Sequence, residues 1–192
     1  MGGITWESHP TSLVESSHVG PGTRLWAFVH VSKGAEIGRD CNIGDHCYVE
    51  GGVKIGDEVV IKNGVSLWNG VTLENRVFVG PNVVFTNDPV PRSKVFHEAY
   101  QRTLVREGAS LGANATLLCG ITVGRYAVIG AGSVVTRSVP DFALAYGNPV
   151  RQHGWVCRCG SRLKPEAGSE DVARCGCGRS YRVSDGKVRE LG

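Results

Sequence analysis

IGRDCNIGDHCYVEGGVKIGDEVVIKNGVSLWNGVTL, residues 37–73, carries a branched aliphatic residue at every sixth position. The series runs from Ile37 to Leu73 without a break, and a small or β-branched residue follows each of its members by four positions. A period of six fits neither an α-helix, whose period is about 3.6, nor an isolated strand, whose period is about 2. The repeating unit is therefore a short strand plus a turn, which is the pattern of a solenoid.

The same phase extends in both directions from this stretch. It begins at Val19, continues to Phe85, is interrupted, and resumes from Val105 to Val135. Counting gives twelve hexads before the interruption and six after it, and three hexads close one turn of a triangular prism. The sequence therefore predicts an all-β fold, a parallel β-helix of about six coils with its aliphatic side chains stacked inside.

The hexads divide the chain into four parts. Residues 1–18 lack the repeat and are expected to cap one end of the solenoid, where an open sheet edge would otherwise be exposed. The β-helix is expected over 19–140, with a corner loop at 88–104 that is long enough to be functional rather than a simple turn. A connector, 141–156, leads to a cysteine-rich unit at 157–192.

The composition favours a globular protein without a polyanion-binding arm. The 192 residues are 41% hydrophobic and carry a formal net charge of +3, with no long basic run. No stretch has the roughly 18 consecutive apolar residues of a membrane span, and the N-terminus has no signal-peptide pattern. We therefore expect no nucleic-acid partner, no membrane insertion and a cytoplasmic location, where thiols stay reduced.

Four of the seven cysteines form two Cys-x-Cys-Gly motifs near the C-terminus. They are Cys157-Arg158-Cys159-Gly160 and Cys175-Gly176-Cys177-Gly178. Four thiolates suit a tetrahedral, structural Zn²⁺ site, and iron is the main competitor. A unit of about 40 residues has too little core to fold alone, so we expect metal to stabilise it. The sequence leaves open whether this unit also docks a partner protein.

Four further segments carry information beyond the aliphatic positions. They are Phe85-Thr86-Asn87-Asp88 at the entry to the loop, Pro91-Arg92-Ser93 within it, residues 108–115 after it, and Gly147-Asn148-Pro149-Val150-Arg151. Together with the hexads they resemble the left-handed parallel β-helix acyltransferases, and among these the nucleotide-sugar N-acetyltransferases. The resemblance implies the left-handed coil, acetyl-CoA as the donor, a homotrimer, and a role in surface polysaccharide biosynthesis.

The stretch from Gly22 to Val31 narrows this resemblance. It is similar to the branch that acetylates the 3-amino group of a UDP-linked 2-acetamido-3-amino-2,3-dideoxy-glucuronic acid. One departure is Ala27, because the branch usually carries a histidine there. The expected acceptor is therefore a UDP-linked amino sugar, while the identity of the sugar and the choice between UDP and dTDP stay open.

Residues 18 positions apart lie above one another in such a solenoid. One column holds Asn69, Asn87 and, after the loop, Cys119; another holds Trp26, Lys62 and several glycines. The glycines leave a groove that suits a planar base and an anion. Both columns also have a structural explanation, since asparagine favours turns and an exposed lysine needs no ligand. The candidate substrate-binding residues are Arg24, Trp26, His30, Lys62, Asn63 and Asn69.

Acyl transfer to an amine needs a deprotonated amine, a polarised thioester carbonyl and alignment of the two. The catalytic candidates are Asn87, which we favour for positioning the amine, Asp88, and His97, which can act as a general base near neutral pH. The resemblance implies that the coenzyme thiolate can take up the proton instead. The candidates for binding CoA lie in the late coils: Gly112, Ala113, Gly130, Ala131, Arg137 and Arg151.

Three other functions fit parts of the sequence. A sugar O-acetyltransferase of the same fold would depend more strongly on a histidine base. A β-helix carbonic anhydrase would need three histidines around zinc, and the six histidines show no close pair. A binding-only scaffold is opposed by the long loop and by the uneven columns.

Overall fold

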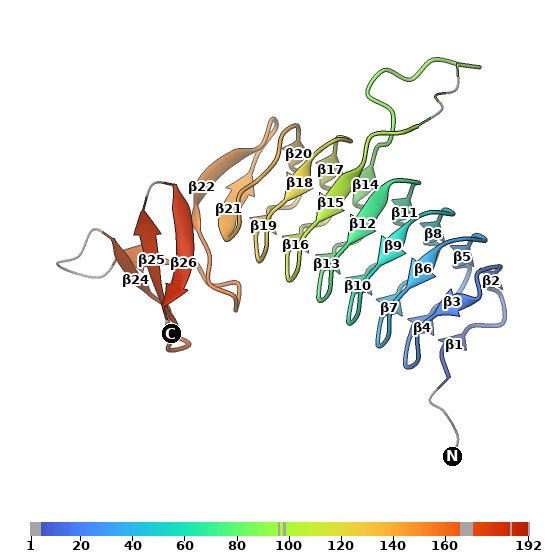
Figure 1. Cartoon of the computed structure of the whole chain (residues 1–192), viewed down its shortest axis with the longest axis horizontal. Coiled ribbons are helices and arrows are strands. Elements are labelled where there is room, and N and C mark those ends of the chain that lie inside the picture. The colour runs from blue at the N-terminus through green and yellow to red at the C-terminus, as the bar shows by residue number, and fades with distance from the viewer. Residues whose placement is uncertain (1–4, 96, 98, 166–170, 185, 192) are drawn as a thin grey trace.

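The computed structural model describes residues 5–95, 97, 99–165, 171–184 and 186–191. Over these ranges the chain forms a β-solenoid followed by a small antiparallel sheet (Figure 1). The all-β prediction is confirmed. The expected segments 1–18, 88–104 and 157–192 each include residues outside the described ranges, and the boundaries at 18, 140 and 156 stay a prediction.

Three parallel sheets, here called A, B and C, form the faces of the prism. Sheet A contains β1 (Glu7–Ser8), β4 (Arg24–Leu25), β7 (Asn42–Ile43), β10 (Val60–Ile61), β13 (Phe78–Val79), β16 (Ser110–Leu111), β19 (Val128–Ile129), β21 (Ala143–Tyr146) and the antiparallel β22 (Arg151–Trp155). Sheet B contains β2 (Leu13–Val14), β5 (His30–Val31), β8 (Tyr48–Val49), β11 (Ser66–Leu67), β14 (Val84–Phe85), β17 (Thr116–Leu117) and β20 (Val134–Val135). Sheet C contains β3 (His18–Val19), β6 (Glu36–Ile37), β9 (Lys54–Ile55), β12 (Val71–Leu73), β15 (Thr103–Val105) and β18 (Thr122–Val123).

The solenoid has about eight turns, so the prediction of about six coils was too low. Sheet A holds eight parallel strands, β1 to β21. The difference arises at the two ends, where β1, β2 and β21 pair with the neighbouring coils without belonging to the aliphatic series. Backbone pairing extends the prism further than the hexads reveal.

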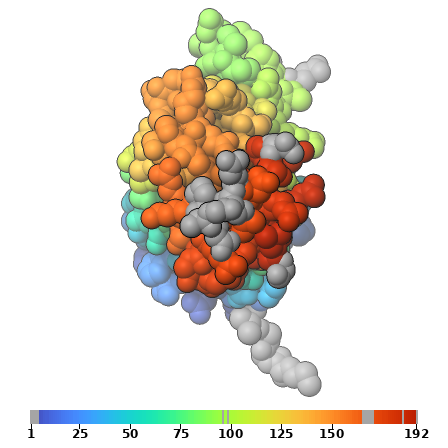
Figure 2. All heavy atoms as spheres, turned by 90° about the vertical axis from the view of Figure 1, so that its left-hand side faces the viewer, coloured from blue at the N-terminus to red at the C-terminus, as the bar shows by residue number. Residues whose placement is uncertain are grey.

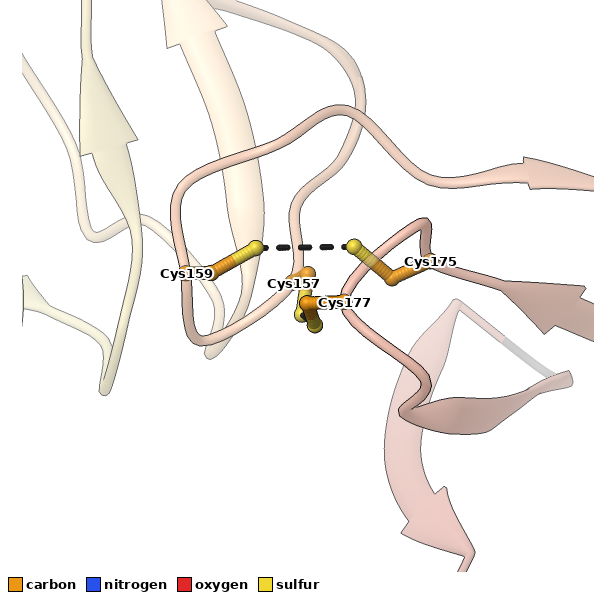
Figure 3. Close-up of side chains that lie close together, drawn as sticks. All are labelled: Cys157, Cys159, Cys175 and Cys177. Atoms are coloured by element: carbon orange, nitrogen blue, oxygen red, sulfur yellow. Dashed lines mark hydrogen bonds between the residues drawn. The ribbon is translucent and has the colours of Figure 1, made fainter.

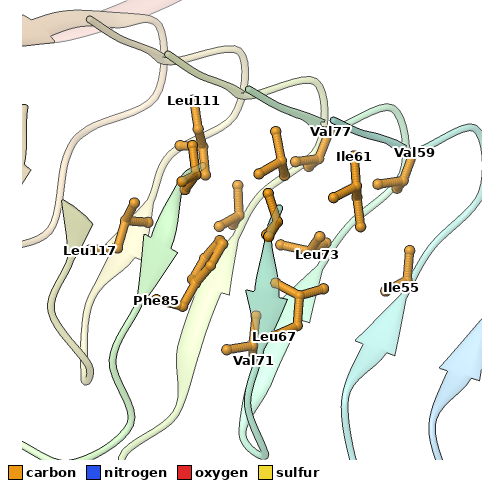
Figure 4. Close-up of a cluster of buried hydrophobic side chains, with 14 of the residues drawn as sticks. Ile55, Val59, Ile61, Leu67, Val71, Leu73, Val77, Phe85, Leu111 and Leu117 are labelled. Carbon is orange, nitrogen blue, oxygen red and sulfur yellow. The ribbon is translucent and has the colours of Figure 1, made fainter. Parts of the chain in front are cut away.

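The core consists of side chains stacked along the axis of the prism. In sheet A, Leu25, Ile43, Ile61 and Val79 occupy successive rungs and are at most 1% exposed. Figure 4 shows how Ile55 and Leu73 from sheet C, Leu67 from sheet B and Ile61 from sheet A point towards one interior. Burying a side chain of this size contributes about 1.5–3 kcal/mol, which explains why the series tolerates only apolar residues.

The corners differ in what their backbone permits. At the corners between sheets A and B and between sheets C and A, residues other than glycine can occupy the turn. His46 (φ 58°) and Glu58 (φ 58°) there adopt the left-handed conformation, which L-residues can adopt at this value of φ. Between sheets B and C the corresponding φ is 86 at Gly34, 88 at Gly52 and 93 at Gly70. Only glycine adopts such values without strain, so this corner is glycine-specific.

The predicted loop leaves from the glycine-specific corner. It follows β14 and rejoins the solenoid at β15, and Figure 1 shows it extending away from the prism. Val71 pairs with Thr103 rather than with residue 89, after which Leu104 pairs with Thr122 and the spacing of 18 is restored. The insertion therefore leaves the register of the coils on either side unchanged.

The C-terminal unit forms a second sheet. Its strands are β23 (Lys164–Pro165), β24 (Val172–Arg174), β25 (Ser180–Ser184) and β26 (Lys187–Leu191), all paired antiparallel. β25 and β26 form a hairpin in which Arg182 pairs with Arg189, and Asp185 between the two strands lies outside the described residues. In the described part of the chain, no helix is long and apolar enough to cross a bilayer.

Thr103, at the base of the loop, carries a buried hydroxyl that provides a test of this packing. It is 1% exposed, and its Oγ1 has no hydrogen-bond partner among the described residues. We expect Thr103→Val to raise the free energy of unfolding by about 1 kcal/mol, because an uncompensated desolvation cost is removed. Thr103→Ser keeps the hydroxyl and loses a buried methyl group, so it should lower stability. Denaturant unfolding of both variants measures this, and a valine variant no more stable than the parent would mean that the hydroxyl has a partner.

Candidate functional site

A hollow opens at the corner between sheets A and B, near the N-terminal end of the solenoid. The cavity has a volume of about 250 Å³ and is lined by Trp26, Asn42, Gly44, Asp45, Ile61, Lys62 and Asn63. Three of the substrate-binding candidates, Trp26, Lys62 and Asn63, thus lie around one space. The close packing of the next coil explains the glycine at position 44, since a Cβ there would stand 2.4 Å from Asn63 Oδ1 and 2.8 Å from Asn63 N. The wall of the hollow therefore carries no side chain at this point.

Neighbouring polar groups fix the walls of this hollow. Trp26 Nε1 donates to Asn42 Oδ1 at 2.6 Å, and the Arg24 guanidinium lies 4.0 Å from the centre of the Trp26 ring. Asn63 Nδ2 donates to Asp45 Oδ2 at 3.0 Å. Sequence reasoning missed Asn42 and Asp45, although the spacing of 18 places Asp45 between Ala27 and Asn63 in one column. The hollow thus combines an indole face with the cations of Arg24 and Lys62.

His30 belongs to the neighbouring face rather than to this hollow. It lies on β5 of sheet B, where Nε2 is 3.0 Å from Glu15 Oε2 and the ring centroid is 5.2 Å from that of Tyr48. It does not line the cavity that contains Trp26. The structure therefore separates His30 from the residues with which it was grouped.

The loop corner brings two catalytic candidates together. His97 Nε2 lies 3.3 Å from Asp88 Oδ2, and the Asp88 side chain is 14% exposed whereas that of His97 is 45% exposed. The other carboxylate oxygen of Asp88 accepts a hydrogen bond from Val90 N at 2.9 Å, so the carboxylate has a fixed orientation. The Tyr100 ring stands edge-on to His97, with the centroids 6.3 Å apart. Asn87 is half-buried beside Asp88.

Asn69 has a structural role in the same column. Its Nδ2 donates to Gly51 O at 2.8 Å, and its backbone nitrogen donates to Glu50 Oε2 at 2.7 Å. These bonds hold one coil against the coil before it. The Asn69 amide nitrogen therefore serves the packing of the coils, and a substrate contact by this side chain stays a prediction.

The late-coil CoA candidates share the corner between sheets A and B with the hollow. The pairing of Leu111 with Ile129 stacks Gly112 over Gly130 and Ala113 over Ala131. A Cβ on Gly112 would stand 2.4 Å from Ala131 N, so close stacking of coils explains this glycine without any ligand. The extended, bare ridge that results also allows close approach of a ligand to the backbone.

The two arginines predicted to bind CoA, Arg137 and Arg151, both lie near the C-terminal end of the solenoid. Arg137 lines a cavity of about 300 Å³ at the C-terminal end of the solenoid, together with Val150 and Gln152. Arg151 lies on β22 and is not part of that lining; its Nη1 donates to Val150 O at 3.1 Å. Only Arg137 therefore faces a described cavity.

Within one chain the candidates fall at two different corners. Trp26, Lys62 and the CoA ridge lie between sheets A and B, whereas Asn87, Asp88 and His97 lie between sheets B and C. Sheet B separates the two corners.

The four C-terminal cysteines converge on one point (Figure 3). All four sulfur atoms lie within 4.8 Å of one another, so the cluster can hold a metal ion. The two motifs form equivalent turns: Gly160 N donates to Cys157 O at 2.8 Å, and Gly178 N donates to Cys175 O at 3.0 Å. The Sγ atoms of Cys159 and Cys175 are 3.4 Å apart.

The electrostatics of this cluster favour a bound cation. The hydroxyl and N–H of Ser161 donate to Cys159 and lower the pKa of its thiol to about 6. Although the N–H of Cys177 lowers the pKa of Cys175, burial and the adjacent thiols raise it to about 12. Four thiolates so close together repel one another, and a divalent cation removes this cost. Arg179 Nη1 donates to Cys177 Sγ at 3.3 Å, and its positive charge stabilises the thiolate form of Cys177.

The hexapeptide pattern has a counterpart among known proteins. The bacterial transferase hexapeptide (six repeats) family matches residues 16–51, 52–87 and 102–137. The chain belongs to this family. The matched segments stop where the corner loop begins and resume where it ends, in agreement with the register of β12 and β15.

Individual members of the family refine this assignment. The dTDP-3-amino-3,6-dideoxy-alpha-D-galactopyranose 3-N-acetyltransferase of Aneurinibacillus thermoaerophilus is 52% identical over 183 residues, which cover 95% of this chain and 94% of that relative. The bifunctional protein GlmU of Synechococcus sp. strain RCC307 is 33% identical over 71% of this chain but only 28% of its own length. The hexapeptide-repeat acetyltransferase VCA0836 of Vibrio cholerae has a TM-score of 0.53 at 22% identity, over 72% of this chain and 73% of that one, and supports the fold.

The first of these relatives confirms the predicted enzyme class, a nucleotide-sugar N-acetyltransferase. Its name gives a dTDP-linked 3-amino-3,6-dideoxygalactose, whereas the stretch from Gly22 to Val31 predicts a UDP-linked glucuronate. The finer expectation is therefore not supported by this relative.

The contact of Asp88 with His97 generates a test. We expect His97→Ala to lower kcat about 100-fold if the imidazole accepts the amine proton, a typical value for loss of a general base. His9→Ala is the matched control, because His9 is exposed and its ring nitrogen Nδ1 is hydrogen-bonded to the neighbouring Thr11 at 2.9 Å. Steady-state release of CoA thiol measures both. Full turnover in His97→Ala would assign the proton to the coenzyme thiolate and leave Asn87 to position the amine.

Proposed function

We propose that the protein transfers the acetyl group of acetyl-CoA to the 3-amino group of a dTDP-linked 3-amino-3,6-dideoxyhexose. The support is the relative of that specificity, which is 52% identical over nearly the whole of both chains. Ala27 agrees with a sugar other than the glucuronate, because the histidine usual in the glucuronate branch is missing there. Free thiols in the core, such as Cys41 and Cys47, suit the reducing cytoplasm, where we place the reaction.

The hollow at the corner between sheets A and B is proposed to receive the nucleotide. The Trp26 indole offers a face for a pyrimidine, and Asn42 keeps that indole in place. Lys62 and Arg24 supply charge for the diphosphate. The exposed Arg24 guanidinium lies over the Trp26 ring and so stays beside the hollow.

The proposed chemistry takes place at the loop corner. The amine nitrogen attacks the thioester carbonyl carbon, a C–N bond forms, and the C–S bond breaks as CoA leaves as a thiolate. His97 Nε2–H is proposed to donate a hydrogen bond to the Asp88 carboxylate, which leaves Nδ1 unprotonated and able to accept the proton that the amine loses. Asn87, half-buried next to Asp88, is proposed to hold the amine in line.

The separation of the two corners supports a homotrimer. In a closed ring of three copies, the corner between sheets A and B of one copy faces the corner between sheets B and C of the next. The ridge of Gly112, Ala113, Gly130 and Ala131 would then border the pantetheine of CoA, and Arg137 and Arg151 would supply cations near its phosphates. Each site would need residues from two copies.

The acceptor is tested with purified protein, acetyl-CoA and a panel of nucleotide sugars. We expect thiol release to be fastest with the dTDP-linked 3-amino-3,6-dideoxygalactose and at least about tenfold slower with the UDP-linked 3-amino glucuronate, because each missing polar contact costs roughly 1.4 kcal/mol or more. Preference for the glucuronate would instead support the UDP-linked acceptor that the stretch from Gly22 to Val31 predicts. Release only with a sugar bearing a 3-hydroxyl group would indicate O-acetylation, for which the Asp88 and His97 pair is also suited.

We also propose that the four-cysteine unit binds one structural Zn²⁺. Zn–S bonds of about 2.3 Å place tetrahedral sulfur atoms about 3.8 Å apart. The Cys157 and Cys177 sulfur atoms are 3.5 Å apart, and all four lie within 4.8 Å. Four protein ligands leave no open position, so the site serves the fold rather than the reaction.

Metal analysis of the purified protein tests this assignment. We expect one zinc per chain, and Cys159→Ser should lower the occupancy because a ligand is lost. Cys119→Ser is the matched control, since Cys119 is buried outside the unit and should leave the zinc content unchanged. Iron in place of zinc, seen as visible thiolate-to-iron absorption, would change the identity of the metal but keep the site. An equal loss of zinc in Cys119→Ser would point to general unfolding.

A further inference from the structure

The four-cysteine unit is joined to the end of the solenoid by backbone pairing. β22 runs antiparallel to β21, with Ala143 opposite Trp155, and Val156 N donates to Phe142 O at 2.8 Å. Figure 2, viewed from this end, shows the C-terminal unit lying over the last coils. The unit therefore covers an end of the prism whose edge would otherwise be open.

A stack of three rings connects the last coil with the thiols. Tyr126 stacks on Phe142 with their centroids 5.4 Å apart, and Phe142 packs on Tyr181 at 5.7 Å. Tyr181 is fully buried; its hydroxyl lies 3.1 Å from Cys157 Sγ and accepts a hydrogen bond from Arg158 N at 3.1 Å. Side chains of the solenoid are thus separated from a cysteine sulfur only by these rings.

Charged side chains form a second connection. Arg158, within the first cysteine motif, donates to the Tyr126 hydroxyl at 2.8 Å and lies 4.7 Å from the centre of that ring. Its guanidinium also pairs with Glu190 at 3.5 Å, and Glu190 pairs with Arg179 at 3.3 Å. Arg179 in turn donates to Cys177 Sγ at 3.3 Å. Both cysteine motifs are therefore linked to Tyr126 or to the side chains around it.

Among the described residues of the unit, the buried core is small. Its buried cluster consists of Cys157, Leu163, Ala173, Cys175, Tyr181 and Val188, and two of these are members of the thiol cluster. So small a core requires a metal or a disulfide to stay folded. Loss of metal would release the sulfur atoms that position Tyr181, Arg158 and Arg179.

We propose that metal binding and docking of the unit on the last coils are thermodynamically coupled through Tyr126. The inference rests on the proposed metal site and not on the identity of the sugar. Bound metal orders the two cysteine motifs, which hold Arg158 and Tyr181 against Tyr126 and Phe142. Coupling is reciprocal, so a change at Tyr126, which touches no thiol, alters the retention of the metal.

The first test measures transfer of zinc from the full-length protein to a coloured chelator. Tyr126→Leu removes the ring and hydroxyl that Arg158 contacts, and we expect zinc to leave about tenfold faster, within the range usual for coupled sites. Tyr48→Leu is the matched control: Tyr48 contacts His30 and Trp68 far along the solenoid and should leave the release rate unchanged. An unchanged rate in Tyr126→Leu, or equal acceleration in both variants, would overturn the coupling.

The second test follows amide hydrogen exchange before and after removal of zinc. We expect faster exchange at Phe142 and Val156, whose amides bond to Arg125 O and Phe142 O, as well as within the unit. Ser32, bonded to Val49 O in an early coil, should exchange as before. Acceleration confined to the unit would overturn the proposal. A protein that holds no metal overturns it together with the zinc assignment, and neither result bears on acetyl transfer.

Discussion

Backbone hydrogen bonds between successive coils are the constraint on which the rest of the molecule depends. Trp26 N donates to Ile43 O at 2.9 Å, Gly44 N to Ile61 O at 2.8 Å, and Lys62 N to Val79 O at 2.9 Å. Each coil must therefore repeat the backbone path of the coil below it. This repetition stacks aliphatic side chains inside and leaves columns of polar side chains outside, so a functional group is placed by its position in the repeat.

The same constraint explains why a glycine in the turns of the late coils does not by itself indicate a binding site. Gly80 and Gly112 lie where the next coil passes closest, and a Cβ on either would stand less than 3 Å from a backbone atom of that coil. The bare ridge that a ligand could use is thus a by-product of stacking. The proposed site uses positions that stacking leaves free, such as Trp26, Lys62 and the loop.

Features that repeat from coil to coil could be predicted from the sequence, and features that do not repeat could not. The spacing of six was sufficient for the three faces, the interior and the column of Trp26 with Lys62, because all of these repeat. It failed at the two ends, where β1 and β21 pair without an aliphatic hexad, and so the coil count was low. The contact between Asp88 and His97 could not be derived because the loop has no repeat. The cysteine motifs could be recognised because each carries two cysteines and a glycine in one short segment. The contacts of Tyr181 with Cys157 and of Tyr126 with Arg158 could not, because they join residues far apart in the sequence.

The insertion at the glycine-specific corner has an evolutionary consequence. Leu104 resumes pairing with Thr122 at the usual spacing of 18 residues. The pairing of the coils therefore does not depend on the length of the loop that follows β14. Doubling such a loop costs only about 0.6 kcal/mol in closure entropy. Descendants of this scaffold can therefore exchange the whole loop, and with it the groups around Asp88, while every coil keeps its place. If the loop acts on the acceptor as proposed, the acceptor can change while the fold stays the same.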